Sequence, residues 1–324
     1  MGKIRLALLS GGDSSEREVS LNSGKQVYEA LDKGKYDIVR YDPKTDLKQI
    51  VEDAQSIDVA LLILHGPNGE DGTVQGLLDL LKIPYQGSGV LGSALAMNKL
   101  AAKKMYEQAD IMVPPYISFS KGDTLKKGDL LPISGWIDKL GLPIVVKPAC
   151  AGSSVGMSIV KAGEGEDIDK VKDNIAQAVE RAFEFDSNII LESYIKGVEL
   201  TCGVLGNRYL EALPVIEIIP GKGYDFFDYN AKYLKGASEE ICPARIDDTV
   251  REKVQAYAIA AHRALFLRGY SRSDMILSDG DVYLLETNTI PGMTATSLYP
   301  QSAQVAGYSF SQILDRLIAL AMES

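Results

Sequence analysis

The sequence predicts a mixed α/β and α+β protein whose first part is a doubly wound domain with a parallel sheet. Three observations support this fold class. Short apolar runs alternate with helical patterns over the first 98 residues, as in parallel sheets covered by helices. Two apolar runs joined by a loop of small residues follow, and the last third combines strand patterns with two long helical patterns. A chain of 324 residues is long enough for two or three domains.

The first domain is expected to cover residues 1–98. Its predicted elements are a strand at 4–9, a helix at 20–31, strands at 36–41 and 58–64, and a helix that ends near Leu81. Glu16 follows the first strand, and His65 follows the third strand. Ligands of doubly wound sheets bind at these carboxyl ends. However, a single histidine is more often structural, and Glu16 can simply supply negative charge at a helix N-terminus.

The second part is expected to cover residues 99–190. The predicted elements are a helix at 99–108, a strand at 142–147, a small-residue loop at 148–154, a returning strand at 155–160 and a helix at 167–183. Two strands joined by a short glycine-bearing loop and covered by helices indicate a small α+β domain.

The third part is expected to cover residues 191–324. Its predicted elements are strands at 189–192, 200–205 and 210–218, a helix at 249–266, strands at 273–277 and 282–286, and a closing helix at 310–322. A long irregular segment lies at about 221–243 and carries Phe227, Lys232 and Tyr233. Loops of this length are usually functional, so this one is a candidate to close over a site, although an ordinary excursion would look the same.

Composition narrows the range of partners. Lys and Arg number 34 against 44 Asp and Glu, which gives a net charge of -10. A surface this acidic does not attract nucleic acid or an anionic membrane, so any phosphate must be held by a few placed cations. No apolar run approaches membrane-spanning length, and the N-terminus is too short for a signal peptide. The three widely spaced cysteines indicate a reduced, cytoplasmic setting without structural zinc.

Oxygen-bearing side chains gather near the end of the chain. Glu286 and Asn288 are two residues apart on an extended segment, so their side chains leave the same face. Mg²⁺ prefers such oxygen ligands, and Asp274, Glu286 and Asn288 are therefore predicted to hold metal. The alternative is a solvated hairpin with scattered acids.

The hairpin loop decides whether Asp274 shares the face of Glu286. A two-residue turn at Asp279 and Gly280 would place Asp274 opposite Leu285, on the other face. A three-residue loop at 278–280, with Gly280 in the left-handed conformation, places Asp274 with Glu286. We therefore predict the three-residue loop.

A second cluster joins Lys147 to the small residues 149–156. Small residues let backbone N–H groups close over phosphate oxygens, and Lys147 ends a strand beside them. Lys99, at the start of a helix, is a further candidate for contact with phosphate. A flexible loop and a solvated lysine would give the same pattern.

Gly87, Gly89 and Gly92 match the dinucleotide motif GxGxxG. The motif does not follow the first strand of the sheet, and its acidic residue, Asp110, lies beyond a long helix. A glycine-rich turn into a helix is the better interpretation. The chain has no Walker A sequence.

The chain resembles the D-alanine–D-alanine ligase family of the ATP-grasp superfamily along almost its whole length. The matching segments are Ser15–Ser20, His65–Gly66, Gly69–Gly72, Tyr85–Gly89, Val146–Pro148, Gly152–Gly156, Tyr229–Tyr233 and Glu286–Thr294. Each motif alone is weak, but the ordered series is specific. The chain departs from the family pattern at Ala149-Cys-Ala151 and at Ser193, where relatives often carry larger or charged residues.

The resemblance implies a three-domain ATP-grasp architecture and a cytoplasmic enzyme of peptidoglycan precursor synthesis. Such an enzyme joins two D-alanines with ATP through an acyl phosphate, uses two Mg²⁺ ions, for which Mn²⁺ substitutes, and is commonly a homodimer.

The resemblance also implies roles for individual residues. The implied ATP-binding residues are Lys99, Lys147, Glu192, Ile195, Glu199 and Lys232, and the implied metal ligands are Asp274, Glu286 and Asn288. The implied substrate-binding residues are Glu16 and His65 for the first D-alanine and Ser297 and Leu298 for the second. The implied catalytic groups are Arg272 and Gly292 at the oxyanion, and Glu16, Ser153 and Tyr233 as a latch for the long loop.

Three alternatives stay open at this point. A sibling ligase that makes D-Ala–D-lactate or D-Ala–D-Ser shares the motifs, although Lys232 and Tyr233 favour the dipeptide. An NAD-dependent oxidoreductase would use Gly87–Gly92. A non-catalytic nucleotide sensor would have no use for the complete set of three predicted metal ligands.

Overall fold

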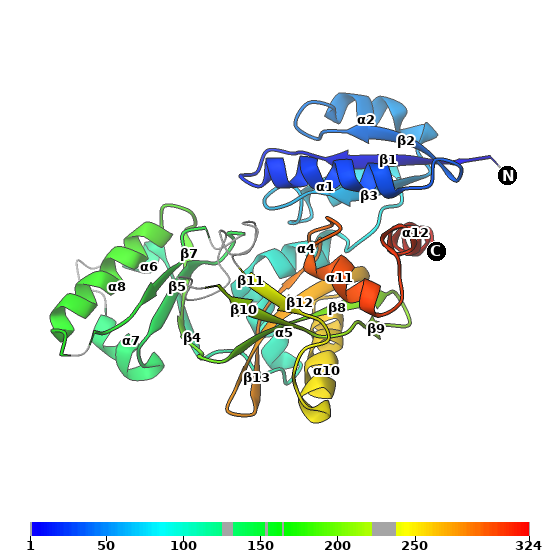
Figure 1. Ribbon diagram of the computed structural model, residues 1–324. Coiled ribbons are helices and arrows are strands. Elements are labelled where there is room, and N and C mark those ends of the chain that lie inside the picture. Colours follow the sequence, from blue (N-terminus) through cyan, green and yellow to red (C-terminus); the bar gives the residue numbers. More distant parts are fainter. Residues whose placement is uncertain (1, 125–131, 153–154, 164, 222–237, 324) are drawn as a thin grey trace.

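The computed structural model describes residues 2–124, 132–152, 155–163, 165–221 and 238–323. It contains one parallel and two antiparallel sheets. Figure 1 shows them as three groups of elements, with the parallel sheet and its helices above the two antiparallel ones. This arrangement matches the predicted fold class.

The parallel sheet has the strand order β2-β1-β3. Its strands are β1 (Ile4–Ser10), β2 (Tyr36–Tyr41) and β3 (Val59–Ile63), and its flanking helices are α1 (Arg17–Ala30), α2 (Leu47–Asp53) and α3 (Thr73–Leu81). Leu6 and Leu8 pack on one face, with Val27 of α1, and Ala7 and Leu9 pack on the other. The sheet is therefore buried on both faces, as an apolar run such as β1 requires.

The end of the chain returns to this first sheet. The closing helix α12 (Phe310–Ala321) begins with a capping box between Ser309 and Gln312. Its Ile313 and Leu317 pack in the same core as Leu6 and Leu8 of β1. The first and last parts of the chain therefore share one core, which Figure 1 shows as α12 beside β3.

The central sheet has the order β4-β7-β5-β6 and is antiparallel. Its elements are β4 (Tyr116–Ser120), α6 (Lys121–Thr124), α7 (Ile133–Leu140), β5 (Ile144–Pro148), β6 (Ser158–Val160), α8 (Ile168–Ala182) and β7 (Asn188–Ser193). Trp136 of α7 and Ile175 of α8 bury against its apolar face. β7 carries the central sheet through residue 190, where the sequence predicts a boundary.

The third sheet has six strands, in the order β11-β10-β8-β12-β13, with β9 beside β8. Its strands are β8 (Val198–Gly206), β9 (Glu211–Ala212), β10 (Ile216–Pro220), β11 (Ser238–Ile241), β12 (Gly269–Ser278) and β13 (Asp281–Asn288). The helices nearby are α4 (Val90–Met97), α5 (Lys99–Gln108), α10 (Asp248–Ala264) and α11 (Leu298–Val305). Tyr106 of α5 and Ala258 of α10 share a core with Val204 of β8.

The β12–β13 hairpin differs from the prediction in one respect. The loop is the two-residue turn Asp279-Gly280, both with positive φ, because Ser278 pairs with Asp281. Asp274 nevertheless pairs with Glu286, since Met275 pairs with Leu284 and the register shifts between Asp274 and Met275. The predicted three-residue loop is therefore wrong, and a β-bulge that adds Leu285 supplies the missing residue.

The glycines of the GxGxxG match serve packing between the first and third parts. Gly269 approaches Gly87 so closely that a Cβ on Gly269 would lie 3.0 Å from the Gly87 backbone nitrogen. A Cβ on Gly92, in α4, would lie 3.0 Å from the carbonyl oxygen of Leu265. Close packing therefore accounts for glycine at these positions, and a dinucleotide site is not needed to explain the motif. In the described part of the chain, no helix is long and apolar enough to cross a membrane.

Candidate active site

Two cavities meet in the middle of the molecule. One, of about 610 Å³, lies between the central and third sheets; the other, of about 510 Å³, lies between the first part and the third. Lys99, Ala151 and Glu286 line both. We call them the sheet cavity and the polar cavity. Nearly all the predicted site residues that the structure describes line one of these two cavities.

The sheet cavity contains a buried cluster of charges. The Glu192 carboxylate lies 2.9 Å from Lys103 Nζ and 2.7 Å from Lys147 Nζ. Burial alone would raise the pKa of Glu192, but the two lysines outweigh burial and hold that pKa below its ordinary value. Burial lowers the pKa of Lys103, which Glu192 opposes. The cluster as a whole carries one excess positive charge, next to the small-residue loop.

The remaining wall of the sheet cavity is largely apolar. Ile195 and Glu199 line it with Val145, Met157 and Ile276. Ser193, which departs from the family pattern, lines the wall but donates its hydroxyl to the carbonyl oxygen of Leu140 at 2.7 Å. An apolar slot with a few placed polar groups suits a planar base.

Lys99 marks the junction of the two cavities. Asn98 caps its helix, because the Asn98 side chain accepts a hydrogen bond from the backbone N–H of Ala101. Lys99 Nζ donates to the carbonyl oxygen of Ala151 at 2.6 Å and lies 3.7 Å from the Glu286 carboxylate. A cation is thus fixed between the small-residue loop and the acidic strand β13.

The predicted metal ligands lie together on the β12–β13 hairpin. Asp274 pairs directly with Glu286, and Asn288 Nδ2 donates to the Asp274 carboxylate at 3.3 Å. Arg272 binds the same carboxylate through two hydrogen bonds, of 2.9 and 3.0 Å. Among the described residues no three His, Cys, Asp or Glu side chains gather as a metal site. Two carboxylates and an amide, completed by phosphate oxygens, still form the set that Mg²⁺ takes in nucleotide sites.

The polar cavity carries the two predicted residues of the first part. Glu16 and His65 are both buried, with 5% and 7% of their surfaces exposed. Burial lowers the pKa of His65, and Arg272 lowers it further, whereas Glu16 opposes them. The Glu16 carboxylate lies next to the small-residue loop, because a Cβ on Gly152 would be 3.3 Å from Glu16 Oε2. Glu16 thus lies where the first part of the chain meets the loop after β5.

Glu70 is a third acid in the polar cavity and was not singled out in the sequence. It lies in the loop after β3 and accepts a hydrogen bond from the backbone N–H of Gly66 at 2.7 Å. Burial, with Glu16 and Glu286 nearby, raises its pKa to about 8, although Arg272 and the Gly66 N–H act in the opposite direction. Acidic side chains outnumber Lys99 and Arg272 in the lining of this cavity, so negative charge is in excess even while Glu70 holds a proton.

Gly292, Ser297 and Leu298 form the far wall of the polar cavity. Ser297 is the N-cap residue of α11, and its Oγ accepts from the Thr294 backbone N–H at 3.0 Å. Gly292 packs against the same side chain, since a Cβ there would be 3.1 Å from Ser297 Oγ. The first backbone N–H groups of a helix lack intrahelical partners, so this end of α11 suits a carboxylate.

Ser153, Lys232 and Tyr233 lie outside the described residues. The structure therefore brings together, in two adjoining cavities, the other predicted site residues. In the sheet cavity these are Lys147, Glu192, Ile195, Glu199 and Asp274; in the polar cavity they are Glu16, His65, Arg272, Asn288, Gly292, Ser297 and Leu298; Lys99 and Glu286 lie in both.

Lys103 is the second residue that the sequence analysis missed. Its signal was available, because Ala102, Lys103 and Tyr106 form the buried stripe of α5. A lysine on the apolar face of an amphipathic helix needs a buried partner. Glu70 had a weaker signal, as an acid in the loop at the carboxyl end of β3.

Comparisons with known proteins agree with this geometry. Residues 40–88 match the family model described as the D-ala D-ala ligase N-terminus, and residues 105–319 match that of the D-ala D-ala ligase C-terminus. A D-alanine–D-alanine ligase of Syntrophobacter fumaroxidans is 57% identical over 99% of this chain and 98% of its own length. The corresponding ligase of Desulfotalea psychrophila is 54% identical over 99% and 96%.

Solved structures show the same similarity. The Bacillus anthracis D-alanine–D-alanine ligase complexed with ATP has a TM-score of 0.82 and 37% identity, with 98% of this chain and 97% of that one covered. The VanG D-Ala:D-Ser ligase of Enterococcus faecalis has a TM-score of 0.81 and 33% identity, with 99% and 100% covered. The chain therefore belongs to the D-alanine–D-alanine ligase family.

Proposed function

We propose that this chain joins two D-alanines to D-alanyl-D-alanine with ATP, through an acyl phosphate, and so supplies a peptidoglycan precursor. The observation that carries the proposal is the junction of the two cavities. Lys99 and Glu286 line both cavities, so a nucleotide in the sheet cavity has its terminal phosphate beside an amino acid in the polar cavity. Joined cavities of this kind bring two substrates into contact.

The sheet cavity suits the nucleotide. The base occupies the apolar slot beside Ile195, where Glu192 and Glu199 offer acceptors for the amino group and the ribose. Lys147 and Lys99 face the phosphates, with Lys232 as a further cation of the long loop. Lys103 neutralises Glu192, and the positive charge of Lys147 is therefore left for the phosphates.

The first D-alanine lies in the polar cavity, with its ammonium group at Glu16 and near His65. A carboxylate is a poor electrophile, so its oxygen attacks the γ-phosphorus of ATP and ADP leaves. Mg²⁺, held by Asp274, Glu286 and Asn288, neutralises phosphate charge when bound, and two ions with Mn²⁺ as a substitute fit this oxygen-donor set.

The second D-alanine binds through its carboxylate at Ser297 and the Leu298 N–H. Its amine attacks the acyl carbon, and phosphate leaves from the tetrahedral intermediate. Arg272 and the Gly292 N–H stabilise the oxyanion, each well-placed donor contributing about 3 kcal/mol. Ser153 and Tyr233 act with Glu16 to latch the long loop, which excludes the water that would hydrolyse the acyl phosphate.

The same proposal includes the setting of the enzyme. We place it in the cytoplasm, as a homodimer without nucleic-acid or membrane partners, and we divide the chain at about residue 98 and at residue 193. The predicted second limit, residue 190, falls inside β7, and we move it to residue 193 because all of β7 pairs within the central sheet. The segment predicted as irregular at about 221–243 contains β11 (Ser238–Ile241), which pairs with β10. The proposed closing loop therefore ends before residue 238.

The proposal is tested by ADP release and product analysis. With D-alanine as the sole amino acid, the protein should release ADP and form the dipeptide. D-lactate or D-serine added with D-alanine should not replace it as the second substrate. A preference for either would assign the chain to a sibling activity, and the absence of ADP release would reject the ligase activity.

A further inference from the structure

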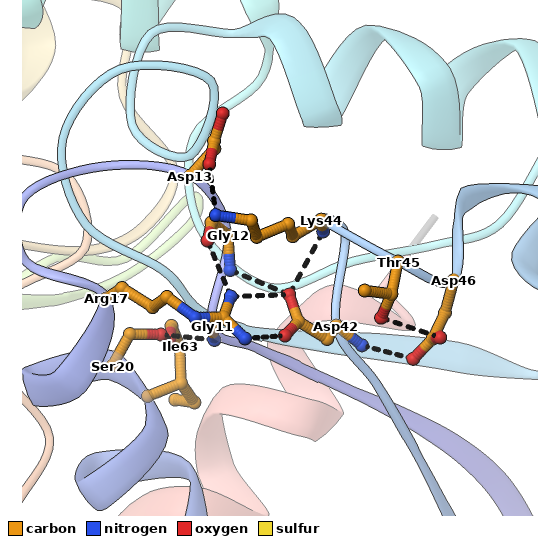
Figure 2. Close-up of polar contacts among 10 residues, drawn as sticks. All are labelled: Gly11, Gly12, Asp13, Arg17, Ser20, Asp42, Lys44, Thr45, Asp46 and Ile63. Carbon is orange, nitrogen blue, oxygen red and sulfur yellow. Dashed lines mark hydrogen bonds and ion pairs between the residues drawn. The ribbon is translucent and has the colours of Figure 1, made fainter.

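Arg17 and Asp42 form an ion pair at the N-terminus of α1 (Figure 2). Arg17 Nη2 lies 2.5 Å from Asp42 Oδ2, and Arg17 Nη1 lies 3.1 Å from Asp42 Oδ1. Arg17 Nη1 also donates to the carbonyl oxygen of Gly12 at 2.7 Å. Both side chains are partly buried, with 28% and 18% exposed. Two-pronged geometry and partial burial make this pair more rigid than a fully exposed ion pair.

Asp42 also fastens two strand ends to each other. It follows the last residue of β2, and its Oδ1 accepts from the backbone N–H groups of Gly12 at 2.9 Å and Lys44 at 3.0 Å. Gly11 has a φ of +102°, and a Cβ there would lie 2.6 Å from the Asp42 carboxylate. Only glycine fits at position 11, because the carboxylate occupies the space of a side chain.

Ser20, one turn along α1 from Arg17, makes the same kind of attachment. Its Oγ accepts from the Gly11 backbone N–H at 2.7 Å and donates to the carbonyl oxygen of Ile63, the last residue of β3. Arg17 and Ser20 lie three residues apart, so they share a face of the helix. Figure 2 shows both directed at the strand ends. The N-terminus of α1 is thus tied to all three strands.

Glu16 is the residue that this arrangement places. It is the N-cap residue of α1 and precedes Arg17 directly, yet its carboxylate lies on the cavity side, near Gly66 and Gly152. Glu16 lines the polar cavity, whereas Arg17 and Asp42 are not among the described residues that do. The pair therefore acts on the polar cavity indirectly, through Glu16 and through α1 residues such as Val19 and Asn22 that line it.

We infer that Arg17 and Asp42 are positioning residues for the first D-alanine, which they orient by fixing the loop 11–16 and the rotation of α1. This inference rests on the proposed function, in which Glu16 receives the ammonium of that substrate. Glu16 directly precedes Arg17, so the contacts of Arg17 with Gly12 and Asp42 fix the backbone from which the Glu16 side chain leaves. A bound carboxylate that tilts by about 1 Å loses much of its effect on a small ligand.

The charge state supports a permanent clamp. Burial alone would raise the pKa of Asp42, but Arg17 and the backbone N–H groups of Gly12 and Lys44 hold that pKa below its ordinary value. The pair stays ionised at neutral pH. It acts as a fixed support and does not act as a switch.

The test compares Arg17→Met, Asp42→Asn and the double variant with the unmodified enzyme. The rate against D-alanine concentration resolves a KM for each of the two amino-acid sites. We expect the first KM to rise roughly ten- to hundredfold, with the KM for ATP unchanged. The double variant should be no worse than the single variants, because each breaks the same contact. Arg17→Lys should recover part of the loss.

A second readout separates this inference from the ligase activity itself. Hydrogen exchange of backbone amides 12–16 should accelerate in Arg17→Met, whether or not the enzyme turns over. Arg251→Met is the matched control, since Arg251 pairs with Asp248 at 2.6 Å on the exposed side of α10. An unchanged first KM with unchanged exchange, or a parallel rise in the KM for ATP, would overturn the positioning role. A wild-type protein that forms no dipeptide rejects the proposed function, and the exchange result then decides whether the clamp orders the loop.

Discussion

The two cavities that meet at Lys99 and Glu286 handle buried charge in opposite ways. In the sheet cavity, Glu192 lies between Lys103 and Lys147, so its negative charge is more than compensated. In the polar cavity, burial together with Glu16 and Glu286 raises the pKa of Glu70 to about 8, and acidic side chains outnumber Lys99 and Arg272 in the lining. One cavity is prepared for an anion and the other for an ammonium group.

The difference teaches how an acidic chain handles a highly charged substrate. With a net charge of -10, the protein has no general attraction for phosphate. It concentrates a few cations in one buried place and leaves the adjoining place negative. The change from excess positive to excess negative charge lies at Lys99, where a phosphoryl group would pass to a carboxylate.

Glu286→Gln removes a charge from the junction itself, and it should have the largest effect. We expect ligation to fall on the order of 10³-fold, or about 4 kcal/mol, since the cation that neutralises the phosphates loses a carboxylate ligand. ADP release across a Mg²⁺ titration measures the loss. Asp281→Asn, near the turn of the same hairpin, is the control. Unchanged turnover would reject the metal assignment.

Lys103→Met tests the sheet cavity alone, where two lysines compensate the charge of Glu192. Removal of one of two counter-ions from a buried carboxylate should lower the free energy of unfolding by about 3 kcal/mol. The KM for ATP should also rise about tenfold, or about 1.4 kcal/mol, because Glu192, which already contacts Lys147 at 2.7 Å, then neutralises the charge of Lys147 alone. The first D-alanine KM should not change. Lys104→Met, the exposed neighbour, is the control, and equal thermal unfolding of both variants would contradict the buried network.

Glu70→Gln tests the polar cavity, whose negative charge is not compensated, through the pH dependence of stability. The folded protein holds a proton on Glu70 up to about pH 8, whereas the unfolded chain loses it near the ordinary value of 4.5. The folded state therefore binds more protons in this window, and stability falls as pH rises through it. In the variant, the fall in the free energy of unfolding with rising pH should be smaller by about 2 kcal/mol, a figure reduced for the partial exposure of Glu70.

The measurement is thermal unfolding of the ligand-free protein between pH 5 and pH 9. Glu52→Gln, an exposed acid of α2, serves as the control and should keep the wild-type profile. A Glu70→Gln profile that falls as steeply as the wild type would show that Glu70 does not titrate in this range.

Arg245→Met gives the smallest expected effect. Arg245 pairs with Glu217 at 2.6 Å in the wall of the sheet cavity, but its side chain is 62% exposed. Glu217 is only 9% exposed and also accepts from the Arg245 backbone N–H, a contact that the variant keeps, so the loss should be about 1 kcal/mol. Chemical unfolding and the KM for ATP should both stay close to wild type. A loss as large as that of Lys103→Met would contradict the distinction between buried and exposed pairs.

Local patterns predicted much of the molecule. The strand β2 was predicted with its observed limits, and α5 was predicted from Lys99 to Gln108. Strands such as β4 were missed because the alternation of Ile117-Ser-Phe-Ser120 covers only four residues, and the place of the strand is decided by pairing with β7. Pairing between distant segments is a tertiary property that a single run of residues does not contain.

The candidate site shows the same limit. Asp274 and Glu286 were predicted on one face, and they pair as expected, but through the bulge at Leu285 rather than through a longer turn. Turn types follow from residues such as Asp279 and Gly280. A bulge depends on how neighbouring strands twist and pack, which the hairpin sequence alone does not specify.

The shared walls of the two cavities have a thermodynamic consequence. Lys99 and Glu286 belong to both binding sites, so each ligand changes the charge environment of the other. Linkage then requires that any factor by which ATP alters the affinity for the first D-alanine equals the factor by which D-alanine alters the affinity for ATP. The junction thereby gives the two affinities one common coupling factor, whichever substrate binds first.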